Sequence, residues 1–357
     1  MAVYRIYPEK DTFISSEPSI AGTYGNAGKD EILEIGSYLD DNLTARANRA
    51  LVKFRNTDIS TAYNLVSGSQ YITNLKIYLA EGGEIPQSFG LLAHPVTASW
   101  LEGTGKASDE PKNTTGTSWK YTDALTTEWA TLGGDFDTDI INWQSFDLSS
   151  NYDINLNITD IVNEQLPIGS RINEGILIKL SGSLETDVTS SVNLKYFSSD
   201  TNTIFPPSLE FKWDDSRYDS SSLSLLTTDI ANITIKNARE KYADSDKVRF
   251  RLSARPQYPT RTFTTSSIYL TEYRLPSASY WAIKDEFSEE MIIDFDTSYT
   301  KISADSNSSY FDVYMNTLQP ERYYRLLVKT ELNDNSIVID NKNIFKVTRN
   351  GWKIENF

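Results

Sequence analysis

This chain offers few types of side chain that could take part in catalysis: it has one histidine, no cysteine and 49 acidic residues. The single imidazole, His94, excludes paired-histidine metal sites and leaves one ring for any histidine-based relay. Because His94 stands in the apolar stretch LLAHPV, we expect a hydrogen-bonded histidine of a strand or loop rather than a catalytic group. The absence of cysteine removes disulfide and thiolate chemistry.

Three aspartates, Asp135, Asp137 and Asp139, have the spacing of the first three ligands of a calcium loop. The rest of the pattern does not fit, because Ile140 stands where the loop needs glycine and Phe146 where it needs a bidentate glutamate. We therefore favour a solvated acidic turn at this position.

Paired carboxylates are the minimum requirement for glycoside hydrolysis. The acids that suggest such a pair are Glu102, Asp109, Glu110 and Asp123. In a chain this acidic, close pairs occur by chance, and no nucleophile elbow, phosphate-binding loop or zinc-protease motif accompanies them. The sequence therefore predicts a protein that is not an enzyme, with no catalytic residues, no metal and no cofactor.

Tryptophans are the other notable group, because an exposed indole ring can stack on the apolar face of a sugar. For Trp100, Trp119 and Trp143 we favour packing in a core or loop, and we expect Trp129, in TTEWATLGG, to be the exposed one. Trp129 is thus a candidate contact for a glycan or a partner protein. Trp352, in the C-terminal GWKIENF, is a second candidate, which either covers its own domain or docks on a neighbour.

Length and charge limit the partners. A chain of 357 residues suggests two or three domains. Its net charge of −15 disfavours binding to nucleic acid or to anionic membrane surfaces. No secretory signal or long apolar segment is evident, so we expect no membrane association.

The elements that must position these residues are predicted to be strands. β-Branched and aromatic residues alternate with polar ones over strand-length segments, and turn-forming clusters separate them. In the first part of the chain these segments are 49–55, 73–79, 175–180, 192–197 and 208–213. One short helix is predicted at 158–166, whereas 227–242 remains undecided between helix and strand.

The polar run at 213–222 suggests a domain boundary, which gives domains 1–215 and 216–357. The second domain is predicted to be all-β as well, with a hairpin turn at Asn333 to Asn335. Its predicted strands are 247–255, 267–275, 290–295, 310–315, 323–332, 336–340 and 343–348.

The first domain contains a series of short motifs in a characteristic order: Asp11-Thr12-Phe13, Tyr24-Gly25-Asn26, RALVKF, NLKIYL, Trp100-Leu101-Glu102-Gly103, Thr117-Ser118-Trp119, Trp143, SFDL, ITDIVNEQL and YFSSDTNTIFPPSLEFKW. Together they resemble the DNRLRE-type jelly-roll domain, a β-sandwich of surface and carbohydrate-associated proteins. The resemblance implies a jelly roll across residues 1–215.

In the second domain, Leu318, Pro320 and Tyr323 are similar to the tyrosine corner of fibronectin type III and other immunoglobulin-like sandwiches. The resemblance implies that a tyrosine hydroxyl bonds back to upstream backbone. The Leu-x-Pro-x-x-Tyr spacing selects Tyr323 over Tyr324 for this role.

The segment from 302 to 347 further resembles the C-terminal sandwich of structural proteins in tailed-bacteriophage virions. This resemblance implies a virion protein of the neck, collar or tail, assembled in the bacterial cytoplasm. We expect several copies to dock on a ring of partner virion proteins and to seat fibres. The alternative is a carbohydrate-binding surface module, whose partner would be a host glycan.

Overall fold

The computed structural model describes residues 2–19, 22–66, 68–81, 88–166, 169–187, 191–259 and 271–349. Within these residues the fold is all-β, as the sequence predicts: mostly antiparallel strands form several sheets, and two short α-helices accompany them. No helix in the described part is both long and apolar enough to span a membrane.

The elements of the first 213 residues are mostly short strands. In chain order they are β1 (Ala2–Ile6), β2 (Pro8–Ser15), β3 (Ile32–Leu39), β4 (Ala45–Phe54), α1 (Asn56–Val66), β5 (Tyr71–Ile77), β6 (Leu79–Glu81), β7 (Phe89–Pro95), β8 (Asn142–Phe146), β9 (Ile154–Asn157), α2 (Thr159–Gln165), β10 (Ile176–Leu180), the 3₁₀ turn η1 (Gly182–Thr186), β11 (Val192–Phe197) and β12 (Ser208–Trp213).

The remaining residues form a second series of strands. These are β13 (Ala231–Ile235), β14 (Lys241–Ala243), β15 (Lys247–Pro256), β16 (Ser279–Asp285), β17 (Met291–Ile293), β18 (Ser303–Ala304), β19 (Ser309–Tyr314), the 3₁₀ turn η3 (Met315–Thr317), β20 (Tyr323–Leu332) and β21 (Asn335–Thr348).

Contacts divide the chain into two compact units. The N-terminal unit comprises Ile6–Leu65 and Ile72–Glu210. The C-terminal unit comprises Phe211–Phe357 together with two short earlier segments, Met1–Arg5 and Val66–Tyr71. The sequence pattern suggests a boundary between residues 215 and 216 but gives no sign of these two short segments, because their membership depends on long-range contacts.

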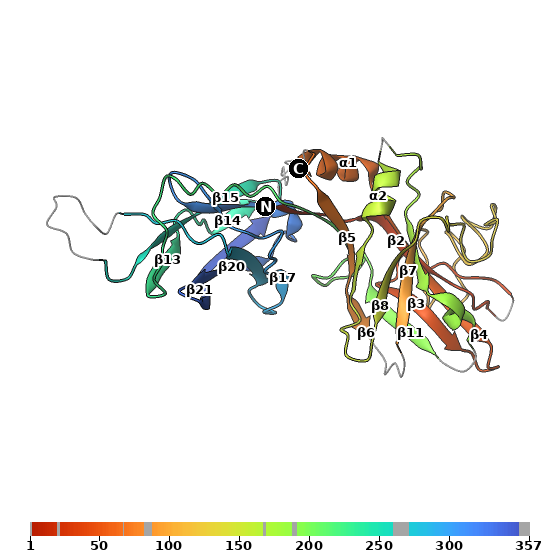
Figure 1. Ribbon diagram of the computed structural model, residues 1–357. Helices are drawn as coiled ribbons and strands as arrows, with labels where there is room; N and C mark the ends of the chain where they lie inside the picture. The colour runs from red at the N-terminus through yellow and green to blue at the C-terminus, as the bar shows by residue number, and fades with distance from the viewer. Residues whose placement is uncertain are drawn as a thin grey trace, which may run out of the picture. The chain divides into compact units, whose positions relative to one another are not determined.

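The N-terminal unit is built around an eight-stranded sheet with the order β6-β11-β3-β4-β10-β7-β8, in which β2 also pairs with β4. Figure 1 shows β3, β4, β7, β8 and β11 of this sheet together. Side chains alternate along each strand, so that Leu33 and Ile35 of β3 are buried while Glu34 between them is half-exposed. This alternation supplies both an apolar core and a row of polar side chains.

A second apolar cluster forms where the long connection between β7 and β8 folds back onto the sheet. Trp100 and Trp129 of the connection pack with Ile14, Leu51 and Leu177, which belong to three different strands. Backbone hydrogen bonds within the connection, such as Trp129 N to Lys120 O at 3.0 Å, hold it in shape. The connection is therefore an ordered part of the unit.

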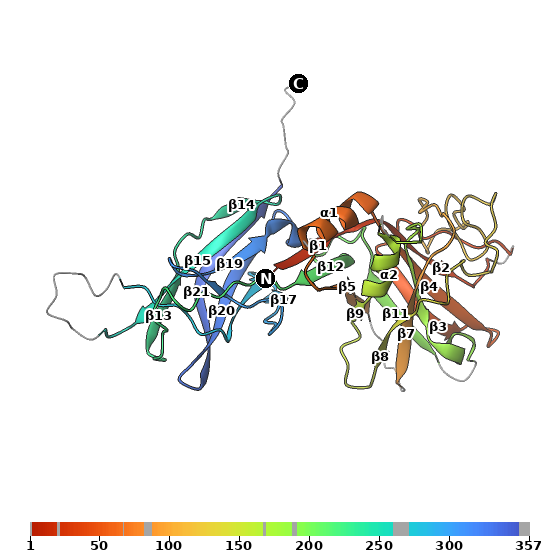
Figure 2. The same ribbon diagram turned by 45° about the horizontal axis from the view of Figure 1, so that its top comes forward.

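The C-terminal unit is a sandwich of a four-stranded sheet, β13-β15-β19-β18, and a five-stranded sheet, β14-β21-β20-β16-β17 (Figure 2). Aromatic rings from both sheets fill its core. Trp281 of β16 stacks on Phe311 of β19 with ring centroids 5.3 Å apart, and Phe250 and Phe345 pack nearby. Burial of such rings is the main source of stability in a small sandwich.

Several expectations about individual elements need correction. Helix α1 was not predicted, although Ile59, Ala62 and Val66 recur on one helical face and are buried. In the undecided segment 227–242 the chain forms strand β13 and the start of β14. Predicted strand 267–275 lies partly outside the described residues, and its described end has only an isolated bridge at Arg274.

The C-terminal hairpin is confirmed with one change. Asn333 and Asp334 have positive φ angles of 50° and 63° and join β20 to β21. Residues able to adopt this conformation are the ones that favour a tight hairpin turn. The two strands predicted after the turn are one continuous strand, β21, because residues 341–342 remain in it.

The tyrosine-corner prediction selected the wrong tyrosine. Tyr323 is 41% exposed and contacts Phe287 edge-on, whereas Tyr324 is buried and its hydroxyl donates to the Gln319 carbonyl at 2.9 Å. Leu318 is buried and Pro320 is half-buried, as a corner requires. The error arose because spacing alone does not show which of two adjacent side chains points inward when strand β20 begins.

Candidate functional site

The sequence-based candidates for surface contact are largely reversed by the structure. Trp129 is only 4% exposed, and its indole N–H donates to the Ser118 carbonyl at 2.9 Å. Trp143, which was expected to be packed, is 66% exposed on β8. Trp129 is buried because the connection that carries it folds onto the sheet, and Trp352 lies outside the described residues.

His94 occupies the structural role expected of it. It is buried on β7, and its Nδ1 donates to the Asp137 carbonyl at 3.1 Å. The imidazole also packs against Phe136, with ring centroids 4.8 Å apart. Burial lowers the pKa of His94, so that the neutral form is favoured.

The three aspartates of the rejected calcium pattern do not converge. The Asp135 carboxylate accepts the backbone N–H groups of Ala130 and Thr131 at 2.8 and 2.7 Å. Asp137 pairs with Arg171, and its carboxylate also accepts the N–H of Asp139 at 2.7 Å. The carboxylates of Asp135 and Asp137 therefore serve local structure.

Three of the acids considered for glycoside hydrolysis, Asp109, Glu110 and Asp123, bind neighbouring residues of their own loops and do not face one another as a pair. Asp123 accepts four hydrogen bonds from Thr126 and Thr127, which lower its pKa and close a turn. Asp109 accepts the N–H of Lys106, and Glu110 pairs with Lys112 at 3.5 Å.

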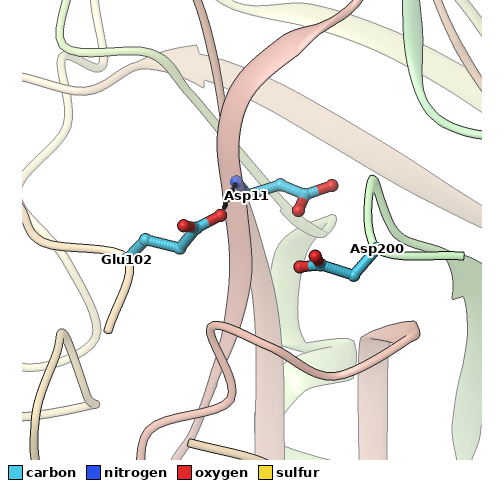
Figure 3. A group of neighbouring side chains, drawn as sticks. All are labelled: Asp11, Glu102 and Asp200. Atoms are coloured by element: carbon cyan, nitrogen blue, oxygen red, sulfur yellow. Dashed lines mark hydrogen bonds between the residues drawn. The ribbon is translucent and has the colours of Figure 1, made fainter. Parts of the chain in front are cut away.

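Glu102 alone joins other acids, in a carboxylate cluster that the structure forms from three separate segments. Asp11 lies on β2, Glu102 follows β7 and Asp200 follows β11, and one oxygen from each lies within 4.8 Å of the others (Figure 3). Carboxylate oxygens at such spacing suit a hard cation. The Lys29 ammonium already supplies positive charge there, because its Nζ lies 3.0 Å from Glu102 and 3.3 Å from Asp200.

Asp11 is the buried member of the carboxylate cluster. Ser199 donates to it twice, through its hydroxyl at 2.6 Å and its backbone N–H at 2.8 Å. Burial nevertheless raises the pKa of Asp11 to about 6, and the charges of Glu102 and Asp200 add to the effect. We interpret this cluster as a set of ion pairs and hydrogen bonds that holds strand β2 against the neighbouring loops.

Asn26 fixes the loops beside the carboxylate cluster. Its side-chain N–H groups donate to the carbonyls of Glu102 and Thr117 at 2.7 and 2.9 Å, and its Oδ1 accepts the N–H of Gly105 at 2.9 Å. Gly103 has a φ of 82° there, and a Cβ on it would lie 2.3 Å from Asn26 Oδ1. Glycine is thus required for this close approach.

A pocket of about 820 Å³ lies next to these loops and is the best candidate for a ligand site in the described residues. Strand residues line one side, and they come from four different strands: Phe13, Glu34, Asn48 and Asn193. Loop residues at 17–19, 23–27 and 106–112 line the rest of it. We call this space the polar pocket.

The strand side of the polar pocket carries a small amide and carboxylate network. Asn48 donates to Glu34 at 2.8 Å and to Asn193 at 3.4 Å, and Asn193 also donates to Glu34 at 3.3 Å. The Asn48 Oδ1 is buried and accepts no hydrogen bond from the described residues. The network therefore contains more acceptors than donors.

Tyr38 completes the strand side. Its hydroxyl donates to Glu17, a loop residue that also lines the pocket. Burial raises the pKa of Tyr38, and the Glu17 carboxylate raises it further, so the phenol stays protonated. An aromatic ring beside amides and carboxylates can contact a ligand that has both apolar and hydroxyl surfaces.

Reasoning from the sequence missed the polar pocket. Its strand residues are ordinary polar positions in alternating segments, and nothing in their spacing indicates that β2, β3, β4 and β11 meet. The nearest signal was the resemblance, since its motifs contain Phe13, Asn26 and Glu102, which the structure places at or beside the pocket.

Fold and pocket define the chain as an all-β sandwich protein with a polar surface site. A scan against protein-family models finds no match, and a search of curated protein sequences finds none either. Among solved structures, the chain is similar to a DUF4785 family protein from Legionella pneumophila, with 9% identity and a TM-score of 0.20, over 96% of this chain and 66% of that one, just under two thirds of its length.

A second solved structure is the binding domain of botulinum neurotoxin DC in complex with SialylT. The chain is 9% identical to it, with a TM-score of 0.18, over 94% of this chain and 68% of that one. Both scores are too low to carry an argument about fold or function.

Proposed function

We propose that the chain is a non-enzymatic structural component of a tailed-bacteriophage virion. In this proposal it is assembled in the host cytoplasm and docks on a ring of partner proteins in the neck, collar or tail, where it seats fibres. Support comes from the sequence resemblance described above and from one feature of the surface. That feature is a group of exposed apolar side chains at the end of the large sheet.

This group, which we call the β8 patch, consists of Trp143 on β8 and of Ile141 and Leu148 in the segments that flank the strand; they are 66%, 48% and 68% exposed. β8 is the terminal strand of the eight-stranded sheet, so it combines apolar side chains with the edge of a sheet. Exposed aromatic residues are enriched at the centres of protein interfaces. The β8 patch is therefore the surface that we expect to bury against a partner.

Repetition would make such a modest contact durable. If several copies bind a symmetric ring, each β8 patch meets an identical partner surface. Where the copies are also joined to one another, binding of one copy raises the effective concentration of its neighbour's β8 patch at the next partner surface. A rigid β-sandwich suits this task because its surface is already in the binding conformation, which lowers the cost of association.

The experiment is mass spectrometry of purified particles of the phage that encodes the chain. We expect the protein in virions of the wild type and a large reduction for Trp143→Ser. Phe287→Ser is the matched control, because Phe287 is 75% exposed in the C-terminal unit. Protein found only in soluble lysate would contradict the proposal, and equal loss with both variants would contradict the role of the β8 patch.

A carbohydrate-binding surface module is the second candidate, and the polar pocket favours it. The pocket presents carboxylate, amide and hydroxyl groups beside an aromatic ring. A glycan array separates the two candidates, because it tests purified protein without any virion. Reproducible binding supports the module, and virion incorporation without glycan binding supports a purely structural role.

A further inference from the structure

We infer that the polar pocket is a binding site for a neutral saccharide, held by Glu34, Asn48 and Asn193 through its hydroxyl groups. This inference rests on the second proposed function and names its site and ligand class. It is independent of whether the chain belongs to a virion.

The size of the polar pocket suits a short oligosaccharide. At about 820 Å³ it lies within the roughly 300–1,000 Å³ of typical small-molecule sites. Its strand side comes from paired strands, and Asn26 braces the loops behind its other side through three hydrogen bonds of 2.7 to 2.9 Å. The site is therefore largely formed before a ligand arrives, which lowers the cost of binding.

The hydrogen-bonding groups on the strand side call for a ligand rich in O–H donors. Glu34 Oε2 accepts from both neighbouring amides, and the amide oxygen of Asn193 accepts from Asn48. Asn48 Oδ1 receives no donor from the described residues but is itself buried, so the ligand hydroxyls meet mainly the half-buried Glu34 and Asn193. A vicinal diol can donate to a carboxylate and accept from an amide at the same time, so adjacent sugar hydroxyls match this network.

Charge selects against an anionic ligand. Glu17, Glu34 and Glu110 line the pocket, against Lys106 and Lys112. Lys112 is already engaged, because its Nζ donates to the Ala107 carbonyl at 2.7 Å and lies 3.5 Å from Glu110. A phosphate or carboxylate entering toward Glu34 would lose its hydration and gain repulsion.

Apolar contact comes from the ring of Tyr38 and from the side chains of Pro18 and Pro111. The hydrogen bond from Tyr38 to Glu17 holds the phenol ring in one orientation. Such a fixed ring can pack against the C–H face of a sugar, while the strand residues bind its hydroxyls. A purely polar ligand such as a metal–water complex would not use this apolar side.

The test is a glycan array of neutral, sialylated and amino-sugar oligosaccharides, followed by calorimetric titration with the neutral oligosaccharide that binds best. We expect neutral members to bind, and Glu34→Gln and Asn193→Ala each to weaken binding roughly tenfold or more. Glu81→Gln is the matched control, because Glu81 lies on β6 of the same sheet, outside the pocket, with its side chain 71% exposed and paired with Lys195.

A further variant, Tyr38→Phe, keeps the ring but removes its bond to Glu17, and we expect a smaller loss of affinity. Each variant is checked for unchanged thermal unfolding, so that misfolding is not read as lost binding. Neutral-glycan binding that persists in both Glu34→Gln and Asn193→Ala would overturn the site while leaving the carbohydrate-binding function standing. No binding on the array, or binding of sialylated members alone, would overturn the inference.

Discussion

The two units hold carboxylates in opposite ways: Asp11 is buried, whereas Asp305 is partly exposed and paired with an arginine. In the N-terminal unit, Asp11 is almost fully buried, and its pKa is raised to about 6 mainly by that burial. In the C-terminal unit, Asp305 receives a two-pronged contact from Arg251, and its pKa is lowered to about 2 mainly by that hydrogen bond. Both residues also accept serine donors, so the partner cation and the depth of burial decide the direction.

The two units also differ in the size of their cavities. The N-terminal unit holds the polar pocket of about 820 Å³, whereas a pocket in the C-terminal unit, lined by Ile233, Leu252 and neighbouring residues, measures about 10 Å³. In the C-terminal unit, Arg325 is shared among Glu286, Glu289 and Asp340. The Arg325 guanidinium thus pairs with three carboxylates of its own unit. In the polar pocket, by contrast, Glu34 and Asn193 line an open space that a ligand can enter.

The long connection between β7 and β8 creates this difference, and removing its anchor tests that claim. Trp129→Ala should destabilise the N-terminal unit by about 3 kcal/mol, because it leaves a cavity among Ile14, Leu51 and Leu177. Urea unfolding measures the change. An effect near zero would show that Trp129 does not anchor the connection to the sheet, and it would contradict the role given to the connection in the N-terminal unit.

The pH dependence of stability sharpens the comparison next. Because the folded-state pKa of Asp11 lies above its ordinary value of 3.8, its contribution is greatest at low pH and is lost as pH rises from about 4 to about 6. Asp11→Asn should therefore become more stable relative to the wild type, by about 2–3 kcal/mol, between pH 4 and pH 7.

Urea unfolding of both proteins across this range provides the check. Taking the difference between the two proteins removes the contribution of His94, which changes in the opposite direction with pH. A difference in unfolding free energy that stays constant from pH 4 to pH 7 would contradict the raised pKa.

The corrected tyrosine corner gives a smaller effect in the C-terminal unit. Tyr324→Phe removes the hydrogen bond from a buried tyrosine to the Gln319 carbonyl and should cost about 1 kcal/mol. Tyr323→Phe is the matched control and should change stability by less than about 0.5 kcal/mol, because Tyr323 is exposed. Thermal unfolding of the two variants would reverse the assignment if Tyr323→Phe were the more damaging.

The smallest expected effect concerns Asp305. Its lowered pKa means that its contribution is present above about pH 4 and is lost as pH falls toward 2. Since the Arg251–Asp305 pair is partly exposed, Asp305→Asn should cost only about 0.5–1 kcal/mol at pH 7 and less at pH 3. Denaturant unfolding at both pH values measures this, and a larger cost at pH 3 would contradict the sign.

Local sequence patterns were enough to predict the all-β class, helix α2, the hairpin at Asn333, the structural role of His94 and about half of the strands, but not β1, β9 or β16. These features depend on local patterns: alternation of apolar residues, turn-forming side chains and the apolar setting of one imidazole. The sequence also indicated that Tyr323 or Tyr324 forms the tyrosine corner, but it did not show that Tyr324 is the one that points inward.

The position of each candidate site depends on tertiary packing. Burial of Trp129 depends on how a long connection folds onto distant strands. Exposure of Trp143 and the meeting of Asp11, Glu102 and Asp200 depend on which strands become neighbours in the sheet. The polar pocket likewise joins strands and loops whose residues are distant in sequence. Long-range packing leaves little local pattern, because the same residue types serve equally well at a solvated surface or beneath a loop.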